Sequence, residues 1–113
     1  MDRQALIELR DQVKAGTLPM GYNADRLDCG ALSARWSDVE KAFDGSLDAA
    51  KALHEAVLPG WEWRLRDNRA WVWTGVLVYG GEEVETAEFC GLPARAWLLA
   101  ILDALIAKEA SDG

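Results

Sequence analysis

The sequence predicts an α+β fold in which a three-stranded antiparallel meander, at about residues 61–66, 70–79 and 82–89, packs against helices. Two observations carry this prediction. Four of the six tryptophans fall in the alternating segment 61–79, and apolar residues recur at helical spacing on both sides of it. With 113 residues, of which 50% are hydrophobic, the chain is expected to form a single domain, 1–113, with a real core.

Three helices are expected, and each has recognisable ends. They cover about residues 3–15, 46–58 and 93–108. The second has Ser46 as its N-cap and stops at Pro59 and Gly60. The third begins with Pro93 in the first helical position and is apolar nearly all round, so we expect it to be buried on most sides.

Residues 17–45 carry the weakest pattern. Their first half is rich in turn formers, which predicts irregular structure. Further on, Trp36, Val39 and Phe43 recur at spacings of three and four. This spacing predicts a short helical turn or an ordered loop with those side chains packed inward.

The loop at 67–69 decides which tryptophans are buried. A three-residue loop places Trp71 and Trp73 beside the two tryptophans of the first strand, on one face. A two-residue loop places Val72 there instead and sends Trp71 and Trp73 to the opposite face, because a slip of one residue reverses every side chain. We favour the three-residue loop, since it buries all four indoles.

Composition excludes several classes of partner. The net charge of −7 argues against direct binding of nucleic acid or of anionic membranes, and it favours a basic partner. The longest apolar run, residues 96–102, is far shorter than a membrane span. We expect Cys29 and Cys90 to be reduced thiols in a cytosolic protein, and neither has a motif that assigns it a role.

The sequence contains no pattern typical of an enzyme or of a metal or cofactor site. His54 is the only histidine, and no cysteine lies at metal-ligand spacing from it. It falls beside the apolar face of its helix, so we interpret it as a surface or boundary residue. No glycine-rich phosphate loop occurs. We therefore expect a protein that is not an enzyme and needs no cofactor.

The third predicted strand is the strongest candidate for a partner surface. It carries Glu82, Glu83, Glu85 and Glu88 and no basic residue. A row of carboxylates on a sheet can imitate a phosphate backbone and occupy a basic groove. The alternative is an acidic edge that only discourages aggregation.

The tryptophan hairpin offers a second candidate. Trp71 and Trp73 are aromatic anchors for a partner if the register exposes them. Together with Arg64, Arg66 and Arg69, an exposed tryptophan could also stack on nucleic-acid bases. Core packing is the simpler interpretation of these indoles, since large aromatics dominate small cores.

Two stretches, GSLDAAKALHEAVLPGW at 45–61 and PARAWLLAILDALIA at 93–107, with a tryptophan-rich segment between them, resemble a family of small phage and prophage proteins of alphaproteobacteria. The matching residues are helix faces and caps, so the resemblance assigns no catalytic residue. Relatives tend to have Asn or Asp before the proline, where this chain has Leu92. The helix cap that such a side chain supplies is therefore absent.

The charge and the resemblance together predict a non-enzymatic, phage-derived interaction protein that binds a host protein. One such class is the anti-CRISPR proteins, which would here occupy a basic nucleic-acid-binding surface through the acidic strand. The alternative is a structural or accessory phage protein that acts by self-association. The sequence leaves open whether the chain is a monomer or a homodimer.

Overall fold

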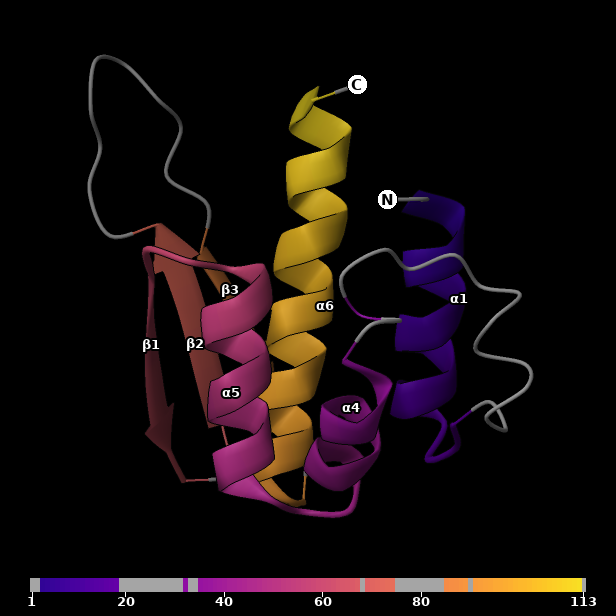
Figure 1. The fold of residues 1–113 in the computed structure, drawn as a ribbon, viewed down its shortest axis with the longest axis vertical. Helices are drawn as coiled ribbons and strands as arrows, with labels where there is room; N and C mark the ends of the chain where they lie inside the picture. Colours follow the sequence, from indigo (N-terminus) through magenta and orange to yellow (C-terminus); the bar gives the residue numbers. More distant parts are fainter. Residues whose placement is uncertain are drawn as a thin grey trace.

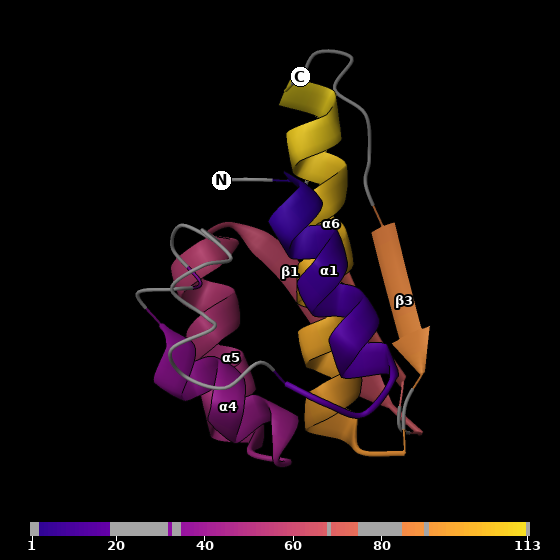
Figure 2. The same cartoon turned by 90° about the vertical axis from the view of Figure 1, so that its right-hand side faces the viewer.

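A computed structural model of the chain describes residues 3–18, 32, 35–67, 69–74, 85–89 and 91–112. Helix α6 runs through the centre, with the sheet on one side and helices α1 and α4 on the other (Figures 1 and 2). The described elements are, in chain order, α1 (Arg3–Lys14), α4 (Trp36–Phe43), α5 (Leu47–Val57), β1 (Trp61–Arg66), β2 (Arg69–Thr74), β3 (Glu85–Phe89) and α6 (Pro93–Asp112).

Helix α6 is the centre of the core, as its apolar sequence predicted. It contacts α1, α4, α5 and all three strands, so little of its circumference is left to water. Its buried residues are Ala94, Ala96, Trp97, Leu98, Leu99, Ala100, Ile101, Leu102, Ala104, Leu105 and Ile106. Four of these are alanines, whose small side chains let neighbouring backbones approach the helix closely.

The predicted ends of α5 are confirmed. The Ser46 hydroxyl accepts a hydrogen bond from the Ala49 amide at 3.2 Å, which satisfies one of the free amides of the first turn. At the other end the chain turns sharply into β1, and Gly60 adopts a φ of 86°, a left-handed conformation that glycine enters without steric cost. This turn brings β1 back beside the helix.

The predicted meander on three helices is wrong. The fold is α+β but mostly helical. The segment predicted as a short helical turn or an ordered loop forms a fourth described helix, α4, in which Val39 and Ala42 are buried. The sheet consists of the β1–β2 hairpin and a five-residue β3 that pairs with β2. β2 is described over Arg69–Thr74, and residues 75–79 of the predicted second strand lie outside the described residues. The predicted turn at residues 80–81 lies outside the described residues.

The predicted register of the hairpin is also wrong. Arg66 pairs with Arg69, so two residues connect the strands, and Trp63 faces Val72. Asp67 has a φ of 53°, which a two-residue hairpin turn requires and which aspartate tolerates better than most residues. Packing explains why this register wins. β2 contacts α6, and the side chains of Ala70 and Val72, which are small and fully buried, face the core there.

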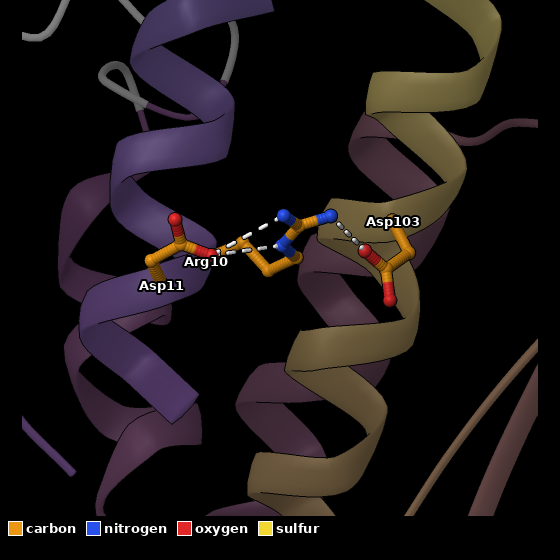
Figure 3. A network of polar contacts seen from close by, with 3 residues as sticks. All are labelled: Arg10, Asp11 and Asp103. Atoms are coloured by element: carbon orange, nitrogen blue, oxygen red, sulfur yellow. Dashed lines mark hydrogen bonds and ion pairs between the residues drawn. The ribbon is translucent and has the colours of Figure 1, made fainter. Parts of the chain in front are cut away.

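Both charged residues within the apolar part of α6 bind another helix. The Arg95 guanidinium donates to the Phe43 carbonyl at 3.0 Å, at the end of α4, and lies 3.9 Å from the centre of the Phe43 ring. Asp103 accepts a hydrogen bond from Arg10 of α1 at 3.0 Å, while Arg10 also contacts Asp11 at 3.2 Å (Figure 3). The bond to Asp103 raises the pKa of Arg10. These contacts fix α4 and α1 against α6.

The two carboxylates around Arg10 are expected to differ in their effect on stability. Asp103 is 17% exposed and Asp11 is 62% exposed. We expect Asp103→Asn to lower the free energy of unfolding by about 1–2 kcal/mol, between the values typical of surface and buried ion pairs. The matched change Asp11→Asn should cost less than about 0.5 kcal/mol. Urea denaturation measures both, and equal losses would contradict the assigned pairing.

Candidate functional site

The observed register sorts the hairpin side chains onto two faces. Trp61, Leu65, Ala70 and Val72 belong to the face that packs on the core, and Trp63 of the same face is 39% exposed at its margin. The other face, here called the hairpin outer face, is the surface that the two-residue turn creates. Its residues are Glu62, Arg64, Arg66, Arg69, Trp71 and Trp73.

Trp71 lies at the centre of the hairpin outer face, between two arginines. Arg64 is its partner on β1, and its Cζ atom lies over the indole, 4.6 Å from the ring centre. Arg69 precedes Trp71 by two residues on β2, and its Cζ lies 5.8 Å from the same ring. Both distances are within the range of cation–π attraction. Both guanidinium groups therefore lie against the same indole.

A hollow of about 350 Å³ opens at this end of the hairpin. It is lined by Arg64, Arg66, Asp67, Arg69 and Trp71. Arg66 lies 3.6 Å from Asp67, and both side chains of this pair are largely exposed. Within the described part of the chain, neither Arg64 nor Arg69 has a carboxylate at ion-pair distance. The hollow is thus a positive spot on a chain of net charge −7.

The observed register places both predicted aromatic anchors, Trp71 and Trp73, on the outer face. Trp71 and Trp73 are half-buried, and Arg64, Arg66 and Arg69 are exposed. Tryptophan and arginine are the residues most enriched among the energetic centres of protein interfaces. A rigid sheet that is supported from behind by α6 holds them in place.

The acidic candidate surface lies on β3 and on the residues that precede it. Glu82 and Glu83 lie outside the described residues. Glu85 and Glu88 belong to β3, at the edge of the sheet, and their Cα atoms pair with Trp73 and Ala70 of β2. The proposed partner surface on this strand remains a prediction from the sequence.

His54 is not the boundary residue that the sequence suggested, because it is only 1% exposed. Its Nδ1 accepts a hydrogen bond from the Trp97 indole at 3.3 Å, and its Nε2 donates to the Trp61 carbonyl at 3.0 Å. An indole N–H only donates, so these bonds select the neutral ring with its proton on Nε2. The spacing of four from Ala50 and three from Val57 could have placed His54 on the buried face.

The surroundings of His54 favour its neutral form. Burial lowers the pKa of His54 below its ordinary value of 6.5, and this outweighs the opposite effects of the Trp61 carbonyl and of the charges on Glu55 and Glu62. The ring also stacks obliquely on Trp97, with 5.8 Å between ring centres. Both ring nitrogens form hydrogen bonds within the fold, so we interpret His54 as a structural residue that connects α5, α6 and the start of β1. Cys29 and Cys90 lie outside the described residues.

The chain gives no match to protein-family models, to known proteins or to solved structures. Across the described ranges, no group of three or more His, Cys, Asp or Glu residues could hold a metal ion. No helix in the part that the structure describes is long and apolar enough to cross a membrane. Among the described residues, the hairpin outer face is therefore the strongest candidate for a functional surface.

Proposed function

We propose that this chain is a non-enzymatic interaction protein and that the hairpin outer face is its contact surface. The observation that carries the proposal is the position of Trp71 and Trp73 on the face turned away from the core, next to three exposed arginines. Burying two large indoles in a partner supplies binding energy, and the arginines supply orientation through directed hydrogen bonds.

Half-burial of the two indoles supports this function in two ways. Each ring is held by its neighbours before a partner arrives, so little conformational entropy is lost on binding. Each ring also keeps apolar surface available for contact. The cation–π contacts of Arg64 and Arg69 fix the ring of Trp71 in particular. A surface of this kind is prepared for binding without rearrangement.

Affinity capture from the native host tests the proposal. The wild-type chain is expected to retain a specific host protein that mass spectrometry identifies. The double variant Trp71→Ala/Trp73→Ala should bind that protein at least about 30-fold more weakly, the loss typical of an interface centre. The matched control is Leu47→Ala/Leu92→Ala, which removes two exposed apolar side chains elsewhere, 45% and 40% exposed. Equal retention by both variants would contradict the proposal.

A second candidate function is favoured by the charge of the whole chain. In it, the chain is a phage-derived inhibitor, of the anti-CRISPR type, whose acidic segment occupies a basic nucleic-acid-binding surface of a host protein. The net charge of −7 and the four glutamates between residues 82 and 88 support it. The same capture experiment separates the two. Replacing the four glutamates by glutamine should abolish capture only if this second function holds.

A further inference from the structure

We propose that the hollow between Arg64 and Arg69 binds carboxylates of an acidic segment in the partner protein. The inference rests on the proposed function, because it names the partner chemistry of the same surface. It predicts a partner in which Asp or Glu side chains stand close to one another in an exposed segment, and in which one carboxylate reaches the guanidinium groups beside Trp71.

Two of the guanidinium groups that line the hollow lie beside Trp71. Arg64 and Arg69 come from neighbouring strands and converge on one indole, at 4.6 and 5.8 Å from its centre. A guanidinium over an aromatic ring uses its flat face for that contact, while its N–H groups point outward along its edge. Those edges match the two oxygens of a carboxylate. Both guanidinium groups therefore lie beside one indole and line the same hollow, where their N–H edges can bind carboxylates.

The side chains that line the hollow are more basic than acidic. Its lining contains Arg64, Arg66 and Arg69 but only one acid, Asp67, which lies next to Arg66. In the described part of the chain, the other two arginines have no carboxylate partner. A bound carboxylate would supply the missing charge, and its hydrogen bonds to the two forks would be charge-assisted.

The size of the hollow and the position of Arg64 favour an acidic peptide over a nucleic acid as the ligand. The hollow, at about 350 Å³, has the volume of a small ligand site and does not form a long basic stripe. Arg64 also covers a face of the Trp71 ring on which a base would have to stack. At physiological salt, charges act over about 8 Å, so a local cluster of carboxylates can bind despite the net charge of −7.

Fluorescence anisotropy tests the inference with three labelled probes. The first is a short peptide of alternating Glu and Gly, the second has Gln in place of Glu, and the third is an oligothymidylate of the same net charge as the first. The Glu peptide is expected to bind in a saturable manner and to weaken as salt is added. Tighter binding of the oligothymidylate, or equal binding of the Gln peptide, would overturn the inference.

Two charge-matched variants sharpen the test. Arg64→Gln/Arg69→Gln should weaken the Glu peptide about tenfold or more, because charge-assisted hydrogen bonds are lost. Lys41→Gln/Lys51→Gln removes the same charge from exposed positions on α4 and α5 and should change affinity less than about twofold. Equal weakening by both variants would reduce the site to general electrostatics and overturn the inference.

The outcome also distinguishes this inference from the function on which it rests. If the tryptophan variant loses its host partner but wild type binds no acidic peptide, the acidic-segment inference fails and the contact surface stands. If the peptide binds at the arginines while capture ignores the tryptophans, the peptide site stands and the proposed function fails.

Discussion

Replacing Trp97 by alanine is expected to lower the free energy of unfolding by about 3–5 kcal/mol, the range for a truncated core aromatic. Trp97 is 2% exposed and lies on α6 where the central helix meets both α5 and the sheet. Its ring contacts Trp63 at 4.4 Å and His54 at 5.8 Å between centres. Truncation would leave a cavity between three elements and remove the indole donor to His54.

Urea denaturation of the variant measures this loss, and Trp63→Ala is its matched control. Trp63 stacks on the same ring but is 39% exposed, so water already reaches part of it. We expect this second truncation to cost about 1–2 kcal/mol, most of it the aromatic contact. A larger loss for Trp63→Ala than for Trp97→Ala would mean that the sheet, and not α6, supplies the central indole of the core.

The second large effect is expected at His54. The change His54→Leu keeps a similar volume but leaves the Trp97 indole N–H and the Trp61 carbonyl without their partner. Orphaned buried polar groups cost about 1–3 kcal/mol each, so we expect a loss of about 2–4 kcal/mol. His54→Gln, which can still reach one of the two groups, should lose less. A leucine variant as stable as wild type would contradict the structural role of the two bonds.

The pH dependence of stability gives an independent measurement on His54. Its folded pKa lies below 6.5, so as the pH falls below that value the unfolded state takes up the proton first. Stability should therefore be constant above the unfolded pKa, decrease below it, and level off below the folded pKa. His54 is the only histidine, so down to about pH 5 this decrease should vanish in His54→Leu. A decrease that persists in the variant would contradict the assignment.

Local signals in the sequence predicted three of the four described helices. The Ser46 cap, the stop at Gly60 and the apolar sequence after Pro93 each depend on residues close together in the chain. The short helix α4 was visible only as a spacing of Trp36, Val39 and Phe43, since eight residues beside a segment rich in turn formers carry little pattern. Its end is completed by Arg95, which is far away in the sequence.

The hairpin register could not be decided from the strands alone. Burial of all four indoles favoured a three-residue loop, but it requires space in the core for four large side chains. In the structure β2 contacts α6, and the β2 side chains buried completely against the core are the small Ala70 and Val72, which limits the space for indoles there. This limit on space comes from the tertiary contact between α6 and β2, so it cannot be predicted from the sequence of the hairpin alone. The same constraint places Trp71 and Trp73 on the outer face.

The candidate site was therefore only half predictable. From the sequence, Trp71, Trp73 and the three arginines formed a candidate contact surface on the condition that the register exposes them. The acidic strand was the stronger candidate because the net charge of the chain is negative. The convergence of Arg64 and Arg69 on one indole depends on cross-strand pairing, which changes with every slip in register.

NMR titration of the chain with the acidic peptide locates the binding surface, because each tryptophan has its own indole N–H signal. We expect the Trp71 signal to shift together with the backbone amides of Arg64 and Arg69. The buried Trp97 signal should stay in place. Shifts confined to β3 or to the helices, with Trp71 unchanged, would contradict the claim that the hairpin outer face is the binding surface.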